Sequence, residues 1–341
     1  MSAAVPAVGI RVPPCVPGDR LVRTVRRAEE LGFDQAWFPD SQLLWRDVFT
    51  SLTAAALGTE RIGLGTAVTN FATRHPAVLA SAARSVAELA PGRFVLGVGV
   101  GNSSVGPVGM RPSTGAEMRA GIATLRALLE GRDHDFGGTV SRLRDPVEVP
   151  VFMAASGPRN LRLAGEIADG AVLLSGVSPA TLADAAARVA EGADAAGRAP
   201  VPLVASAFCA VTDDVERAAR QLKPICAGIA RNGGGKALAL AGVHVDVPDR
   251  IEGVYPDLVH AEDWDAAVRI CSQWVSDEAA AAFARAFCLF GTGEEIAARL
   301  RGLGAAGVGG VFLQHVGSYD LPEDLIEAVG RSVLPALRER A

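Results

Sequence analysis

Eight short hydrophobic runs recur along the chain, and amphipathic stretches with helical spacing lie between them. Runs that are apolar at nearly every position are typical of strands buried on both faces, as in a parallel sheet. Eight alternations of this kind predict an α/β protein, a closed (β/α)8 TIM barrel, with an open doubly wound sheet as the alternative. The strands are expected at residues 7–12, 35–40, 62–68, 94–100, 149–155, 170–175, 202–211 and 309–316.

The amphipathic stretches carry residues that begin and end helices. Asp19 stands at the head of one stretch, and Gly32 follows its last apolar residue, as a C-terminal glycine does. Pro76 opens another stretch as a first-turn proline. The helices are expected at residues 19–31, 46–58, 76–90, 113–130, 158–167, 178–196, 213–230 and 322–339.

Two segments interrupt this alternation. Residues 131–148 are polar, which predicts a hairpin-like insertion before the fifth strand. Residues 231–290 form a longer excursion before the last strand. Because the loops after barrel strands build the active face, we expect the longer insertion to form a lid or a substrate pocket. A helical insertion without a function is the alternative. Residues 1–341 are thus expected to form a single barrel domain with two insertions.

Composition narrows the class of protein. The 341 residues are 49% hydrophobic, which is enough for a large core, and the net charge is −5. Because no basic run of five residues accompanies this charge, we expect no nucleic-acid surface. No apolar stretch reaches 18 residues and the amino-terminal stretch lacks a signal-peptide pattern, so we expect a cytoplasmic protein without a membrane span. The five scattered cysteines include no CxxC pair and are expected to be reduced thiols.

The stretch VLGVGVGNSSVG at 95–106 places glycines at alternate positions where the fourth strand ends. Glycine at a strand end indicates that a ligand or another backbone comes close. The dinucleotide pattern G-x-G-x-x-G is not met, because its third glycine position is Asn102. The chain also lacks a P-loop, an HExxH and a G-x-S-x-G motif, and its five histidines are far apart in sequence. These motifs therefore predict neither a known nucleotide fingerprint nor a metal site.

The stretch AASGPRN at 154–160 runs from the fifth strand directly into a helix. Ser156 and Gly157 would place backbone N–H groups and a hydroxyl at the positive end of that helix, which suits an anion. A plain helix cap at Ser156 is the alternative.

Polar residues also end the second and third strands. Asp40, Ser41 and Trp45 follow the second strand, and Thr66 and Asn70 end the third. In a barrel these positions lie around one mouth, where small and polar residues suit a flat ring laid against the backbone. For Asp40, a helix cap is the alternative role.

Three longer stretches extend these patterns: LGTAVTNFATRHPAVLASAARSVAELAPGRFVLGVGVGNSS, VFMAASGP and AGEIADGAVLL. In this order and spacing the chain resembles the bacterial luciferase-like superfamily. It is most similar there to the branch that uses the deazaflavin coenzyme F420, such as the methylenetetrahydromethanopterin reductases. The resemblance runs through about residues 7–330 and is more specific for the superfamily than for the cofactor, since enzymes that use flavin mononucleotide (FMN) share the barrel.

The resemblance implies a deazaflavin ring across the barrel mouth and a non-prolyl cis peptide behind it, which maps to Ala67–Val68. It implies a cofactor phosphate at Ser156 and Gly157. Contacts with the cofactor are expected from Asp40, Ser41, Thr66, Ala67, Val68, Val100, Gly101, Asn102, Ala155, Ser156 and Gly157.

The chain departs from the relatives that oxidise sugar phosphates. Ser41 stands where they have a histidine and Asn102 where they have a glutamate, whereas Trp45 keeps their tryptophan. Because lysine is also nearly absent, a reductase acting on an uncharged or weakly charged small organic substrate fits better. Asn102 cannot act as a general acid, so a proton would come from His315, Asp40 or the long insertion, and Trp45 would form a wall of the substrate pocket.

Two other functions remain open from the sequence. An FMN-dependent monooxygenase of the same fold would use the same barrel mouth, and a non-catalytic barrel would bind a ligand without turnover. The family resemblance also implies a homo-oligomer, a dimer or larger.

Overall fold

In the computed structural model, which describes residues 5–317 and 319–339, eight parallel strands form a closed ring. Each strand pairs with the next in chain order, and the last pairs with the first. The predicted (β/α)8 barrel is therefore confirmed, and the alternative prediction of an open doubly wound sheet is wrong. The barrel strands are β1 (Ala7–Arg11), β2 (Gln35–Phe38), β3 (Gly63–Thr66), β5 (Phe94–Gly99), β8 (Val151–Ala155), β9 (Gly170–Leu173), β10 (Leu203–Val211) and β12 (Gly310–Gln314).

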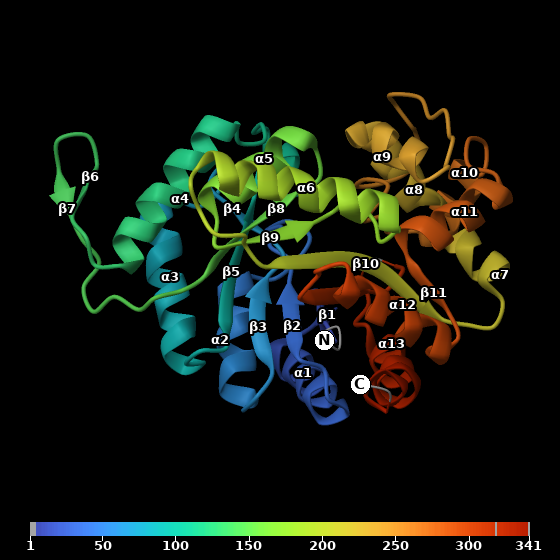
Figure 1. Cartoon of the computed structure of the whole chain (residues 1–341), viewed down its shortest axis with the longest axis horizontal. Helices are drawn as coiled ribbons and strands as arrows, with labels where there is room; N and C mark the ends of the chain where they lie inside the picture. Colours follow the sequence, from blue (N-terminus) through green and yellow to red (C-terminus); the bar gives the residue numbers. More distant parts are fainter. Residues whose placement is uncertain (1–4, 318, 340–341) are drawn as a thin grey trace.

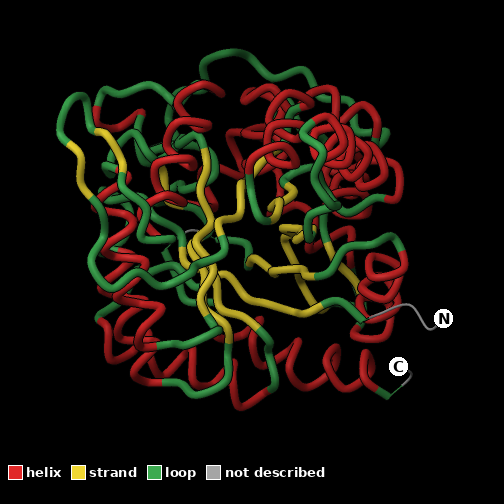
Figure 2. Tube along the Cα trace, turned by 60° about the vertical axis from the view of Figure 1, so that its left-hand side comes forward, coloured by secondary structure: helices red, strands yellow, loops and turns green. Residues whose placement is uncertain are grey.

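Helices surround the strands, as both ribbon views show (Figures 1 and 2). Most of them follow the predicted ranges closely, because their apolar faces are buried against the barrel. The outer helices are α1 (Gly18–Leu31), α2 (Val48–Gly58), α3 (Pro76–Leu89), α4 (Gly115–Leu129), α5 (Pro158–Ile167), α6 (Pro179–Ala195), α12 (Gly293–Ala305), α13 (Glu323–Ala328) and α14 (Leu334–Arg338).

The expected helix at 213–230 is wrong as a single element. It is divided into α7 (Val215–Ala219), a short 3₁₀ turn and α8 (Lys223–Ile229). These pieces pack into a separate hydrophobic cluster rather than against the barrel. The helix that precedes β12 on the barrel's outside is α12, which a capping box at Thr292 and Glu295 begins.

The ends of α1 and α3 test the predicted helix signals. Gly32 ends α1 with φ of 90°, in the left-handed region, and Pro76 begins α3, as predicted. Asp19 is not the N-cap of α1, because the N-cap is Pro17 and Asp19 lies in the first turn. There its carboxylate pairs with Arg23, one turn further on, at 2.9 Å.

Three short pieces of sheet lie outside the ring. β4 (Thr69–Asn70) pairs with the end of β5, and β11 (Leu289–Gly291) extends the sheet beside the end of β10. The antiparallel strands β6 (His134–Asp135) and β7 (Val140–Ser141) form a hairpin within the polar segment 131–148. Figure 1 shows this hairpin projecting at the far left.

The chain between β10 and β11 forms a helical insertion with α7, α8, α9 (Gly235–Leu240), α10 (Trp264–Cys271) and α11 (Asp277–Phe287). It has its own buried core, in which the rings of Phe283 and Phe287 stack at 5.1 Å between centroids. Buried Lys223 joins α8 to α11 through an ion pair with Asp277 at 2.6 Å. These helices gather at the upper right of Figure 1.

A tryptophan fills the interior of the barrel below the mouth. The Trp37 ring on β2 stacks on Phe312 of β12, with centroids 5.4 Å apart. Glycines on the two neighbouring strands leave room for it: a Cβ at Gly9 would lie 3.0 Å from the indole, and one at Gly65 would lie 2.6 Å from it. The alternation of small and large residues thus fills the interior of the barrel.

The helices and the cysteines can be compared with two expectations from the sequence, the absence of a membrane span and reduced thiols. Within residues 5–317 and 319–339, no helix is both long and apolar enough to cross a bilayer. All five cysteines are free thiols, and four of them are buried.

Candidate active site

A cavity of about 230 Å³ opens at the carboxyl ends of the barrel strands. This is the end at which TIM barrels hold their active sites. It brings together most of the predicted site residues, from the ends of four strands and the loops that follow them. They are Asp40, Ser41, Ala67, Val68, Val100, Gly101, Asn102, Ala155 and Ser156; Arg11, Pro39, Gly99, Ser103, Ser104, Ala154, Asn160 and Leu174 complete the lining.

A larger cavity, of about 810 Å³, lies at the opposite end of the barrel. It is lined by the residues that precede β5 and β8, including Pro91, Val149 and Pro150, and by Arg126 of α4. None of the predicted site residues lines it. Since the amino-terminal face of a barrel serves mainly stability, the smaller cavity is the candidate site.

The peptide bond between Ala67 and Val68 is cis, which confirms the prediction for the end of the third strand. Alternate glycines on β5 let this segment approach closely. A Cβ at Gly97 would overlap the carbonyl oxygen of Thr66, and a Cβ at Gly99 would lie 2.7 Å from Val68 Cγ2. The glycines at the end of β5 thus make room first for a neighbouring backbone, which then forms part of the cavity wall.

Thr66 lies behind this wall and does not line the cavity. Its side chain is fully buried, and its hydroxyl donates to the carbonyl oxygen of Gly97 at 2.7 Å. This bond ties the end of β3 to β5. Thr66 therefore holds the cavity wall in place from behind.

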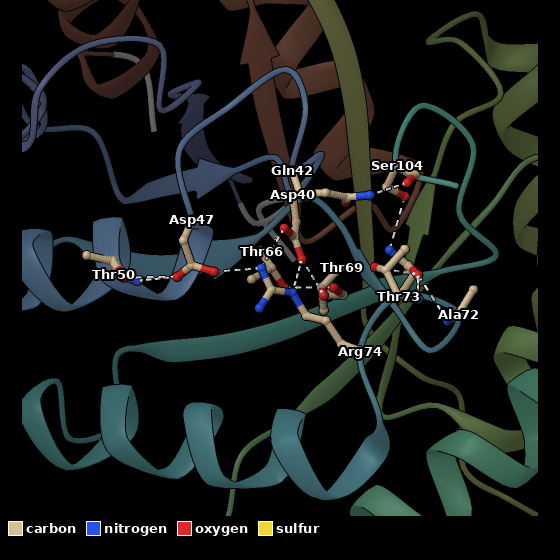
Figure 3. Close-up of polar contacts among 12 residues, drawn as sticks. Asp40, Gln42, Asp47, Thr50, Thr66, Thr69, Ala72, Thr73, Arg74 and Ser104 are labelled. Carbon is tan, nitrogen blue, oxygen red and sulfur yellow. Dashed lines mark hydrogen bonds and ion pairs between the residues drawn. The ribbon is translucent and has the colours of Figure 1, made fainter. Parts of the chain in front are cut away.

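Asp40 is buried and belongs to a network of charged side chains (Figure 3). Its carboxylate accepts hydrogen bonds from Arg74 Nε at 2.7 Å, Arg74 Nη2 at 3.0 Å and Thr69 Oγ1 at 2.7 Å. Arg74 also pairs with Asp47 at 2.8 Å, and Asp47 is the N-cap of α2. The alternative role of Asp40 as the helix cap is therefore wrong. Three donated bonds suit an ionised carboxylate that fixes the mouth of the barrel.

Hydrogen bonds also fix the loop after β5 (Figure 3). Gln42 Nε2 donates to the carbonyl oxygen of Ser104 at 2.6 Å, and Asn70 Nδ2 donates to the Ser104 hydroxyl at 3.1 Å. The hydroxyls of Ser41 and Ser103 lie 2.7 Å apart. Side chains after β2 and β3 thus hold the loop that carries Asn102, whose own side chain is exposed.

Ser156 and Gly157 lie at the start of α5, as the sequence predicts. The N-cap is Gly157, without a side-chain capping bond, so Ser156 is not the plain cap that was the alternative. The Ser156 side chain is exposed and lines the cavity, whereas Gly157 is next to it in sequence and outside the lining. A free hydroxyl and free N–H groups at a helix start can receive an anion.

Trp45 packs beneath the long insertion and does not line the cavity. Trp45 is 5% exposed. The centroid of its ring lies 5.8 Å from the guanidinium carbon of Arg11, 5.4 Å from the centroid of the Tyr319 ring and 5.9 Å from that of the His260 ring. Asp257 holds His260, with its carboxylate 3.0 Å from Nδ1. The insertion therefore reaches the barrel mouth through His260, on top of Trp45.

His315 follows β12 and also lies outside the cavity lining. Neither of its buried ring nitrogens has a hydrogen-bond partner among the residues that the structure describes. Burial lowers the pKa of His315 to about 4, and the nearby Arg11 guanidinium adds to this, while Asp320 acts in the opposite direction. The ring is therefore neutral at pH 7.

The model of the family described as luciferase-like monooxygenase matches residues 6–309. The chain belongs to the luciferase-like monooxygenase family.

Two proteins are similar to this chain in sequence. One is a 5,10-methylenetetrahydromethanopterin reductase from Methanolobus tindarius, 33% identical over 219 residues; the match covers 62% of this chain and 66% of that protein, just under two thirds of its length. Another, a 5,10-methylenetetrahydromethanopterin reductase from Archaeoglobus fulgidus, is 28% identical over 342 residues and covers 97% of this chain and 99% of that protein.

The fold is also similar to a solved structure along almost all of the chain. The structure is that of the coenzyme F420 dependent tetrahydromethanopterin reductase from Methanopyrus kandleri. The TM-score is 0.76 at 23% identity, with 98% of this chain and 100% of that chain covered. At this identity the comparison supports the barrel and its connections alone.

Two arginines of this luciferase-like barrel were not foreseen from the sequence. Arg74 holds Asp40 from the loop before α3, and a single arginine in a polar loop gives no signal of its own. Arg11 ends β1 and lines the cavity. Its signal in the sequence is a polar side chain at the end of the first strand, the same feature that marks the ends of the second and third strands.

Proposed function

We propose that this protein is an F420-dependent oxidoreductase that transfers a hydride between the deazaflavin and a small organic substrate, in the direction of a reductase. The observation that carries the proposal is the similarity, over 97% of the chain, to a relative named as a methylenetetrahydromethanopterin reductase. The cavity at the carboxyl ends of the strands is where the family resemblance places the cofactor.

The residues around the cavity fit a flat ring with an anionic tail. Backbone and small side chains, including Ala67, Gly99 and Ala154, form much of the wall, so a planar group can pack closely against it. At one end Ser156 and the start of α5 offer hydroxyl and N–H donors to a phosphate. When bound, the deazaflavin supplies a hydride donor or acceptor that resists oxygenation.

The chain's own polar residues orient rather than react in this proposal. The carboxylate of Asp40 accepts three hydrogen bonds and suits a positioning role. Asn102 lines the mouth with an amide that donates hydrogen bonds but not protons. His315, neutral at pH 7, can donate or accept a hydrogen bond without placing a second positive charge beside Arg11. Trp45 and His260 of the insertion contact each other beside the mouth, outside the cavity lining.

We also propose that the protein forms a homo-oligomer and acts on a small molecule rather than on nucleic acid. Leu57 on α2 and Val78 and Leu89 on α3 are exposed apolar side chains on two helices that pack together, which supports a contact between copies. The net charge of −5 is consistent with the expected absence of a nucleic-acid partner. A cytoplasmic location is part of the same proposal.

A titration of the purified protein with F420 and with FMN, followed by fluorescence, tests the cofactor. We expect tighter binding of F420, and no oxygen consumption when reduced FMN is supplied. Binding of FMN alone, with oxygen consumed, would establish the monooxygenase alternative instead. Binding of neither cofactor would favour the non-catalytic barrel.

Replacing Ser156 with alanine is expected to weaken F420 binding by about 1–3 kcal/mol, the usual effect of losing a hydrogen bond to a charged group. The same titration measures it. Ser85→Ala is the control, because that exposed hydroxyl bonds only within α3. Equal affinity of Ser156→Ala and wild type would move the phosphate to another part of the cavity.

A further inference from the structure

Arg11 has an unusual environment for an arginine. It ends β1 at the cavity, and its side chain makes no hydrogen bond or ion pair with the residues that the structure describes. The ring centroid of Trp45 lies 5.8 Å from its guanidinium carbon. Arg11 is half-buried. A charged group that is partly removed from water normally has a counter-charge, and none is found for this guanidinium among the described residues.

The remaining charges around the cavity do not supply that partner. Asp40 is the only carboxylate in the cavity lining, and Arg74 already binds both of its oxygens. His315 cannot supply a negative charge either, because a histidine ring is only neutral or positive, and this one is neutral at pH 7. Burial lowers the pKa of Arg11 to about 10, which leaves the side chain protonated at neutral pH. Among the residues that line the cavity, Arg11 therefore has no free counter-charge.

We propose that Arg11 is a substrate-binding residue and that the substrate carries a carboxylate, which the guanidinium of Arg11 binds at the β1 side of the mouth. The planar fork of an arginine matches the two oxygens of a carboxylate and fixes its orientation as well as its charge. A buried anion there would supply the missing counter-charge.

That the anion is a substrate rests on the proposed function, whereas the binding of an anion by Arg11 does not. This inference differs from the expectation of an uncharged or weakly charged substrate, which was based on the scarcity of lysine. The cofactor's own anionic tail is the other source of the same chemistry. Because Ser156 and the start of α5 already offer an anion site from β8, we assign Arg11, on β1, to the substrate.

Calorimetric titration with benzoate, and with its neutral analogue benzamide, tests the assignment in the protein without cofactor. We expect saturable benzoate binding to wild type, at least tenfold weaker binding to Arg11→Gln, and an intermediate affinity for Arg11→Lys, which keeps the charge but loses the fork. Benzamide should bind weakly and equally to all three. Arg23→Met, which removes an exposed guanidinium paired with Asp19, should match wild type.

Three results would overturn the proposal. The first is that benzoate does not bind wild type. The second is that benzoate binds Arg11→Gln as tightly as wild type. If Arg11→Gln does not fold, the affinity of Arg11→Lys is compared with that of wild type instead. In the third, F420 affinity falls in Arg11→Gln while benzoate binding does not, which would assign the guanidinium to the cofactor. Failure of F420 to bind wild type would instead contradict the proposed function. The benzoate titrations contain no F420, so their outcome does not depend on that result.

Discussion

Alanine at position 97 is expected to lower the free energy of unfolding by about 3 kcal/mol, the upper end of the usual cost of overpacking. The added Cβ would overlap the carbonyl oxygen of Thr66 and lie 3.2 Å from Val68 Cγ1. A backbone oxygen cannot rotate away as a side chain can, so β3 and β5 would have to separate. The hydrogen bond from Thr66 Oγ1 to the Gly97 carbonyl oxygen would be strained as well. Urea unfolding followed by circular dichroism measures the change.

Two other glycine substitutions serve as matched controls. Gly99→Ala should cost less, about 1 kcal/mol, because its Cβ would meet only a methyl group of Val68, which can move. Gly302→Ala, at an exposed position within α12 with no atom near the new Cβ, should stabilise by about 0.5–1 kcal/mol. Equal stability of Gly97→Ala and wild type would show that the two strand ends are not packed as described.

Removing Arg74 should have an effect of similar size. Arg74→Met leaves the Asp40 carboxylate, whose side chain is 3% exposed, with Thr69 as its one described hydrogen-bond donor. Breaking a buried ion pair from one side costs about 3–5 kcal/mol, and we expect the lower end, because Arg74 itself is 19% exposed. The link from Asp40 to Asp47 at the start of α2 is lost in the same step. Chemical denaturation measures the loss.

A double variant separates charge from packing at this site. Arg74→Met combined with Asp40→Asn should recover much of the stability, because a neutral amide needs no counter-charge. Arg20→Met, which removes an exposed pair with Glu323, should change stability by less than about 1 kcal/mol. A double variant no more stable than Arg74→Met would contradict the role of the ion pair.

The barrel strands could be predicted because each is buried on both faces and so appears as a continuous apolar run. The helix ends were less certain, since Asp19 suits an N-cap and a first turn equally well, and only the packing of α1 decides between them. The range 213–230 has an apolar spacing that a broken pair of helices also satisfies. The spacing does not indicate whether a helix packs against the barrel or elsewhere. Here α8 packs into the separate hydrophobic core of the insertion.

The site was predictable where a single strand end carries the signal. Glycines at the end of β5, and Ser156 after β8, stand out in sequence and line or support the cavity. Contacts between distant segments were not predictable. The ion pair between Asp40 and Arg74 spans 34 positions, and Trp45 meets His260 from the insertion. Such pairs depend on how loops pack across the mouth, which no local pattern specifies.

A crystal structure of the protein with F420 tests the central claim most directly, because it locates the ring and the phosphate together. The account predicts the deazaflavin ring in the cavity at the carboxyl ends of the strands, against Ala67 and Val68. The phosphate should lie at Ser156 and Gly157, at the start of α5. Density for F420 in the larger cavity beside Pro91 and Pro150, or away from Ala67 and Val68, would contradict it.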